Sequence, residues 1–166
     1  MSEILVRPAR TADVRAIREL VDTYSRDGRL LSKATVTLFE DIQEFLIAEL
    51  DGEVVGCGAL HVMWEDLAEV RTVAVAPAYA RRGIGSVLLT ALMERAREVG
   101  VQRVFCLTFM VRFFEAHGFV EISETPVDQD VYQQLLQSYD EGVAEFLGLE
   151  RVKPNTLGNH RMLAVL

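Results

Sequence analysis

The stretch VAVAPAYARRGIGSVLL, residues 73–89, decides how the rest of the sequence is interpreted. Its apolar first part predicts a strand that stops at Pro77, and its last part has the apolar spacing of a helix. Such a strand-to-helix turn leaves the first amide N–H groups of the helix without partners, at the positive end of the helix dipole. Glycine lets a ligand approach the backbone closely, so the turn fits a phosphate group. The turn contains Arg81, Arg82, Gly83 and Gly85.

The turn matches neither of the two common nucleotide-binding fingerprints. It lacks the pattern G-x-x-x-x-G-K-[ST], and no third glycine follows Gly85 at the spacing of G-x-G-x-x-G. Taken alone, a turn that binds no ligand is an equally good interpretation. The flanking elements have to decide between the two.

The flanking sequence predicts an α+β fold in one domain, residues 1–166. The Asp51-Gly52 pair between two apolar runs predicts a β-hairpin. A helix is expected at 12–24, followed by a second one whose apolar face holds Leu38, Phe39, Ile42 and Phe45. After the helix that Gly100 ends, we expect a strand at 101–109, a short helix at 112–117, a strand at 118–123, a helical segment at 130–147 and a closing strand at 161–166.

Composition narrows the class of protein. The net charge of −8 argues against nucleic acid as a partner, because phosphate backbones attract basic surfaces. No apolar run approaches the ~20 residues that span a bilayer, and the N-terminus lacks the apolar core of a signal peptide. We therefore expect a soluble, cytoplasmic protein. Cys57 and Cys106 have no metal-binding spacing and are expected to be reduced residues of the core.

The order of these elements, together with the R-R-G-I-G-S turn, resembles the GNAT superfamily of N-acetyltransferases over about residues 3–123. The resemblance implies a central, mixed, mostly antiparallel sheet flanked by helices. It also implies acetyl-CoA as cosubstrate and no metal. The family pattern for the pyrophosphate turn is Q/R-x-x-G-x-G/A, and here Ala80 replaces the first residue. The implied acetyl-CoA-binding residues are Val73, Ala74, Val75, Arg81, Arg82, Gly83, Ile84, Gly85 and Ser86.

A more specific resemblance extends over nearly the whole chain. The segments at 56–75, 117–122, 138–159 and 161–166 look like the short, single-domain N-acetylglutamate synthases of arginine biosynthesis in actinobacteria. This resemblance implies an amino-acid N-acetyltransferase that moves the acetyl group of acetyl-CoA to the α-amine of L-glutamate by direct attack on the thioester. The substrate is then a small molecule, and a homodimer is a possible assembly.

The resemblance also suggests catalytic groups. Glu69 matches the position of a general base in several relatives, although a solvated carboxylate at a strand edge is an equal alternative. Many relatives carry a tyrosine acid on the short helix, where this chain has Phe113-Phe114. Three other tyrosines are present, and the sequence brings none of them to the sulfur. They are Tyr79, Tyr132 and Tyr139.

Glutamate has two carboxylates, so its site needs cations. Lys33 matches a substrate-binding arginine of the longer synthases. Arg71 lies on the same strand face as Glu69, where an ion pair with Glu69 or Glu65 is the structural alternative. Further candidates lie at and before the last strand, namely Asn159 and Arg161, with His160, Lys153 and Asn155 as weaker ones.

Two positions depart from the actinobacterial pattern, because Met110 and Arg112 replace acidic residues. If they line the acceptor pocket, they favour negative substrates; on the surface they have no such effect. Three alternatives to glutamate acetylation remain open. L-Glutamine is the nearest alternative acceptor, and the missing tyrosine would suit a non-catalytic acyl-CoA-binding regulatory module. The overall acidity would suit an enzyme for a polyamine or an aminoglycoside.

Overall fold

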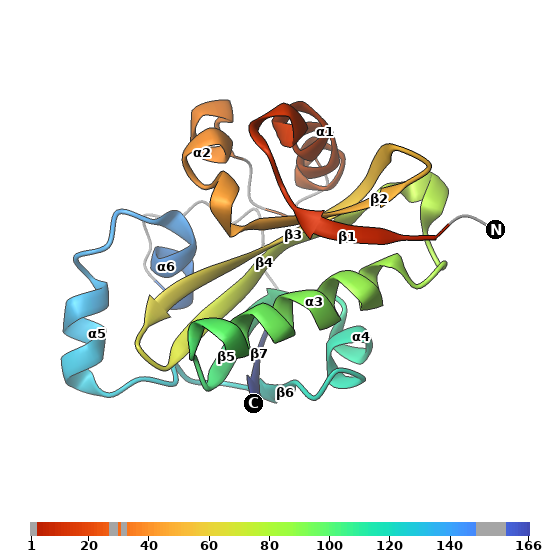
Figure 1. The fold of residues 1–166 in the computed structure, drawn as a ribbon. Coiled ribbons are helices and arrows are strands. Elements are labelled where there is room, and N and C mark those ends of the chain that lie inside the picture. The colour runs from red at the N-terminus through yellow and green to blue at the C-terminus, as the bar shows by residue number, and fades with distance from the viewer. Residues whose placement is uncertain (1–2, 27–29, 31–32, 149–158) are drawn as a thin grey trace.

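The structure is a computed structural model that describes residues 3–26, 30, 33–148 and 159–166. Within them, one seven-stranded sheet has the order β1-β2-β3-β4-β5-β7-β6, and all its neighbours are antiparallel except β4 and β5 (Figure 1). The predicted α+β class with a mostly antiparallel sheet is confirmed. The strands are β1 (Leu5–Pro8), β2 (Phe45–Leu50), β3 (Glu53–Trp64), β4 (Leu67–Val75), β5 (Arg103–Thr108), β6 (Val120–Ile122) and β7 (His160–Val165).

Helices cover both faces of this sheet (Figure 1). One face carries α3 (Ile84–Val99), which packs on β3 and β4, and α4 (Val111–Glu115) lies near its first turn. The other face carries α1 (Val14–Ser25) and α2 (Thr35–Glu40) at one end, and α5 (Gln129–Leu135) and α6 (Glu141–Phe146) at the other. The described residues also form three short 3-10 turns: η1 (Thr11–Asp13), η2 (Ile42–Glu44) and η3 (Pro77–Tyr79).

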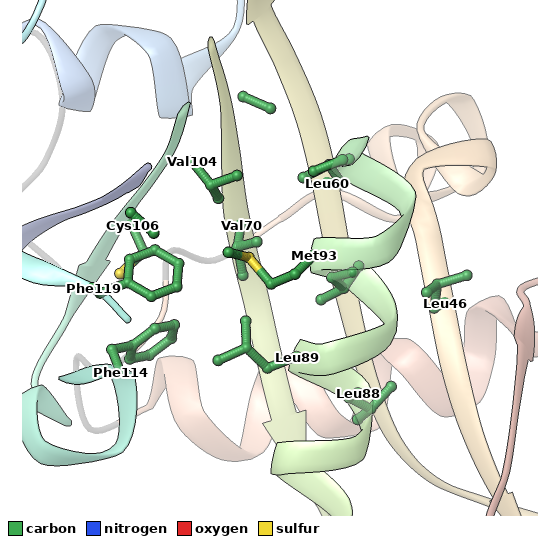
Figure 2. Close-up of a cluster of buried hydrophobic side chains, with 14 of the residues drawn as sticks. Leu46, Leu60, Val70, Leu88, Leu89, Met93, Val104, Cys106, Phe114 and Phe119 are labelled. Carbon is green, nitrogen blue, oxygen red and sulfur yellow. The ribbon is translucent and has the colours of Figure 1, made fainter. Parts of the chain in front are cut away.

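The largest hydrophobic cluster holds α3 against the sheet (Figure 2). Leu88, Leu89 and Leu92 of α3 are fully buried, and the cluster extends to Val70 of β4 and Val104 of β5. Burying one such side chain contributes about 1.5–3 kcal/mol. The packing therefore fixes the position of the first turn of α3 relative to β4.

The central strands β4 and β5 separate partway along their length. Their parallel pairing is confined to Leu67–Glu69, although β4 continues to Val75. On its other edge β4 stays paired with β3 as far as Val75, with an irregularity opposite Gly58 where Thr72 has a φ of 59°. Within the described residues, no strand pairs with the β5-side edge of β4 beyond Glu69. This edge is open to another hydrogen-bonding partner.

Two local predictions are confirmed. Asp51 and Gly52 both adopt positive φ values and join β2 to β3 in a hairpin, because a tight turn between twisted strands requires this backbone. Cys57 and Cys106 are free and buried.

One helical prediction is wrong, and a second is right in type but wrong in continuity. The second helix ends at Glu40, Ile42 lies in η2, and Phe45 is the first residue of β2, where its pairing with Ala59 overrides the local apolar spacing. The segment 130–147 forms two helices, each with its own aspartate N-cap. Within the described residues, no helix is both long enough and apolar enough to cross a membrane.

Candidate active site

The turn before α3 has the backbone of an anion site. Gly83 is the N-cap residue with a φ of +79°, and Arg81 has a φ of 63°. The amide of Val87 donates to the carbonyl of Gly83 over 3.1 Å, so the helical hydrogen bonds begin there. The earlier amides of the first turn have no acceptor within the helix. These are the amides of Ile84, Gly85 and Ser86, three of the residues that the family resemblance implies for acetyl-CoA.

Close packing and open space both surround this turn. The ring of Phe113 lies 3.4 Å from where a Cβ atom at Gly85 would stand, an ordinary contact distance, so α4 packs against the first turn of α3. The guanidinium of Arg82 lies over the Tyr79 ring at 5.3 Å, at the edge of a 610 Å³ cavity. The cavity is also lined by Ile4, Leu50 and Asp51, so it lies on the side of the turn that faces the β2–β3 hairpin.

The strand residues predicted to bind acetyl-CoA lie on the open part of β4. Val73, Ala74 and Val75 all follow the point where β5 separates. The Tyr24 hydroxyl donates a hydrogen bond to the carbonyl of Val75, which anchors the end of the strand to α1. The chain then passes through η3 into the turn, so the strand edge and the anion site are continuous.

Glu69 is the last residue of β4 to pair with β5, and only 3% of it is exposed. The alternative of a solvated edge carboxylate is therefore wrong. Burial raises the pKa of Glu69, against the opposing charge of Arg71, whose Nε donates to Oε1 over 2.8 Å. A carboxylate with a raised pKa is a stronger base, and such perturbed groups are frequent in active sites.

Arg71 is held between two carboxylates. Besides its bond to Glu69, it donates from both terminal nitrogens to Asp140, over 2.9 and 2.8 Å. The predicted structural alternative, an ion pair with Glu69, is present. Burial alone would lower the pKa of Arg71, but Glu69 and Asp140 hold it above its ordinary value. Since all three guanidinium nitrogens already face carboxylates, the geometry does not favour Arg71 as a direct ligand of an acceptor carboxylate.

The network continues to β3 and η2 through residues that the sequence did not reveal. His61 is the cross-strand partner of Glu69; its Nδ1 lies 2.8 Å from Glu44 Oε2 and its Nε2 lies 3.9 Å from Asp140 Oδ2. Asp140 could have been found as an N-cap, because an aspartate stands directly before a short helical run. His61 has no comparable local signal, since only the strand register places it beside Glu69.

Arg161 of β7 reaches the same side of the sheet. Its guanidinium lies 5.1 Å from the Phe105 ring and 5.8 Å from the Phe146 ring, and it donates to the Phe146 carbonyl over 2.6 Å. Burial lowers its pKa, and the negative charge of Glu69 opposes this effect. Its buried Nε has no acceptor among the described residues. Arg161 therefore has donor capacity left for a ligand.

The remaining acceptor candidates are only partly placed. Lys33 is half-buried before α2, close enough that its charge counteracts the burial that raises the pKa of Asp41. Asn159 is half-buried immediately before β7. Lys153 and Asn155 lie outside the described residues. His160 pairs with Glu121 away from the network.

The two departures from the actinobacterial pattern lie at the surface. Met110 is 61% exposed, and Arg112 is exposed in the first turn of α4. The described contacts therefore do not support a place for Met110 or Arg112 in the lining of the acceptor pocket.

The described side chains favour direct transfer over a covalent enzyme intermediate. Burial raises the pKa of Cys57 to about 12, and it also raises that of Cys106, so both stay as thiols near neutral pH.

Phe113 and Phe114 offer no hydroxyl that could act as a general acid. Tyr139 is 97% exposed, and Tyr132 faces the Leu147 carbonyl. Among the described residues, no group of three or more His, Cys, Asp or Glu side chains is placed to hold a metal.

Comparisons with known proteins show the family and the fold of the chain. Residues 14–119 match the acetyltransferase (GNAT) family. An amino-acid acetyltransferase of Mycobacterium tuberculosis is 57% identical over an alignment 166 positions long, which covers 98% of this chain and 94% of that protein. A crystal structure of a protein from the same organism, in complex with CoA and NLQ, superimposes with a TM-score of 0.94 at 57% identity, over 98% of this chain and 99% of that one.

A more distant structure shares the fold as part of a longer chain. The N-acetylglutamate synthase of Neisseria gonorrhoeae, complexed with coenzyme A and N-acetyl-glutamate, is 26% identical with a TM-score of 0.81. The match covers 100% of this chain and 36% of the synthase.

Proposed function

Because the chain belongs to the acetyltransferase (GNAT) family, we propose that it transfers the acetyl group of acetyl-CoA to the α-amine of L-glutamate. The observation that carries the proposal is the place of Glu69. This buried carboxylate lies where β4 and β5 separate, on the strand whose open edge leads to the anion site. A base for the acceptor amine and a site for the donor thus lie on one strand.

The coarser predictions are confirmed. The family match and the CoA-bound relative show an acetyltransferase with the GNAT fold, and acetyl-CoA is the cosubstrate. The cytoplasmic location and the homodimer stay predictions.

The donor half of the proposed mechanism uses the backbone. The pyrophosphate of acetyl-CoA accepts hydrogen bonds from the free amides of Ile84, Gly85 and Ser86, beside Arg81 and Arg82. The pantetheine arm pairs with the open edge of β4 at Val73–Val75. This arrangement brings the thioester towards the point of strand separation, and an amide N–H of β4 stabilises the oxygen that becomes negative during attack.

The acceptor half uses the network. Glu69 takes a proton from the α-ammonium group, and the neutral amine attacks the thioester carbonyl. The tetrahedral intermediate collapses and the C–S bond breaks. The attacking nitrogen gives up its remaining extra proton through water, and the departing CoA thiolate takes a proton from the same water, so the products are the neutral amide and the CoA thiol. Because Phe113 offers no hydroxyl, the rate relies chiefly on placing the amine against the thioester.

Lys33 and Arg161 supply the cations that we propose for the two carboxylates of glutamate, with Asn159 beside them. The charge of Arg161 is weakly solvated, and its Nε is unpaired among the described residues. Lys33 lies before α2, near enough to Asp41 for its charge to lower the pKa of that carboxyl. We assign Arg71 to Glu69 and Asp140 and not to the substrate.

L-Glutamine is the second candidate acceptor, and the pairing of Arg71 favours it. With Arg71 neutralised, the described part of the site has fewer cations for a second carboxylate than the sequence suggested. An amide side chain needs no cation.

The test is release of free thiol from acetyl-CoA with a panel of acceptors: glutamate, glutamine, aspartate, other amino acids, spermidine and an aminoglycoside. We expect selective turnover with glutamate. If glutamine is turned over as fast as glutamate or faster, L-glutamine is the acceptor in place of L-glutamate. Selective turnover of spermidine or the aminoglycoside would overturn the proposal. Binding of acetyl-CoA without any turnover would favour a regulatory module.

A further inference from the structure

Asp140 performs two tasks at the start of α6. Its Oδ1 accepts the amide of Val143 over 2.9 Å, which caps the helix, and the same oxygen accepts from Arg71 over 2.8 Å. Its Oδ2 accepts the other terminal nitrogen of Arg71 over 2.9 Å. A bidentate ion pair of this kind fixes the plane of the guanidinium as well as its position.

The first turn of α6 is shaped around the same guanidinium. A Cβ atom at Gly142 would lie 2.6 Å from Cζ of Arg71, closer than any real contact. Glycine at this position therefore lets α6 approach Arg71 face to face. The side chain of Arg71 is only 9% exposed, so it has little freedom to take another position.

Arg71 passes this constraint on to Glu69. With its terminal nitrogens fixed by Asp140, it has only its Nε to donate to Glu69, over 2.8 Å. We propose that Asp140 is a positioning residue for acetyl transfer, which fixes Arg71 and thereby orients Glu69 towards the acceptor amine. The inference rests on the proposed function, and it gives α6, far along the chain from β4, a part in catalysis.

Charges from several elements act on Glu69. Arg71 of β4 and His61 of β3 lower its pKa, and Asp140 at the start of α6 raises it. From β7, Arg161 interacts with it electrostatically, and so does Cys106 of β5. Glu44 of η2 contributes through His61, whose Nδ1 lies 2.8 Å from its Oε2.

The sign of a pH effect follows from these charges. A carboxylate base works only when it is ionised, so activity rises as pH increases through the pKa of Glu69. In the wild type, the negative charge of Asp140 raises the pKa of Glu69. Removing that charge leaves the positive charge of Arg71 uncompensated by Asp140, so the pKa of Glu69 falls. The acid limb of the rate profile then moves to lower pH.

The test is Asp140→Asn in the full chain, assayed with the best acceptor of the wild-type panel. Asparagine is also a good N-cap, so α6 keeps its cap. We expect kcat to fall about tenfold or more, because a misplaced base transfers protons poorly. The acid limb moves down by about one pH unit. The matched control is Asp128→Asn, which changes the N-cap aspartate of α5, bonded to the Val131 amide, and should alter neither quantity.

A second variant reaches the same contact from the other side. Gly142→Ala keeps every charge and favours the helix, but its methyl group displaces the Arg71 guanidinium. We expect a similar loss of kcat with little change in acetyl-CoA affinity. Wild-type-like kcat and acid limb in both variants would overturn the role of Asp140, whereas a wild-type enzyme that acetylates no amino acid would overturn the proposed function instead.

Discussion

The two halves of the proposed site share strand β4, but one half is formed by backbone groups and the other by side chains. The donor half, from Val73 through Ser86, consists of backbone: an unpaired strand edge, positive φ values and the free amides of a helix. The acceptor half consists of side chains that converge on Glu69 from β3, β7 and α6.

A site formed by backbone and a site formed by side chains respond differently to amino-acid substitution. A backbone site tolerates side-chain replacement wherever the conformation survives, and it fails when a residue cannot adopt that conformation. In a buried ionic network, every charged side chain affects the pKa values of the others. Removing one partner leaves an uncompensated charge, which destabilises the folded protein by about 3–5 kcal/mol. Mutations should therefore separate donor binding from acceptor binding and catalysis.

The largest separation is expected from Gly83→Glu in the donor half. The backbone at Gly83 has a φ of +79°, and the new carboxylate would face the pyrophosphate. We expect the Kd for acetyl-CoA, measured by calorimetry, to rise at least about a hundredfold.

The control is Gly100→Glu at the other end of α3. Gly100 has a φ of +98° and open space around it, so the backbone strain is comparable but lies far from the turn. Its acetyl-CoA affinity should stay unchanged. Equal losses in the two variants would mean that strain in α3, and not the anion site, explains the effect.

A smaller effect is expected from Lys33→Ala in the acceptor half. One partly exposed cation contributes modestly, so we expect the KM for the acceptor to rise about tenfold with no change in acetyl-CoA affinity. Arg97→Ala, an exposed site on α3 paired with Glu94, is the control. If Lys33 binds the α-carboxylate, glutamate and glutamine lose equally; if it binds the side chain, only glutamate loses. An unchanged KM for both removes Lys33 from the site.

The same difference explains what the sequence could predict. The donor half depends on a short local pattern, in which glycines after a strand imply the positive φ and the free amides. The hairpin at Asp51-Gly52 was predictable for the same reason. Glu69 was predicted from the family resemblance, and Arg71 because it shares a strand face with Glu69.

The rest of the acceptor half depends on contacts between distant elements. His61 meets Glu69 only through the strand register, and Asp140 meets Arg71 only because the segment 130–147 breaks into two helices. A continuous apolar spacing concealed this break. The spacing also extended the second helix through Phe45, which the pairing with β3 makes a strand residue.

The central claim is that the buried Glu69 is the base of the acceptor half and is independent of donor binding. The measurement that tests it is kcat/KM against pH for the wild type and for Glu69→Gln, alongside the Kd for acetyl-CoA. We expect glutamine to lower kcat/KM by about a hundredfold to ten-thousandfold, to remove the acid limb and to leave the Kd unchanged. A variant that keeps both its rate and its acid limb would contradict the claim.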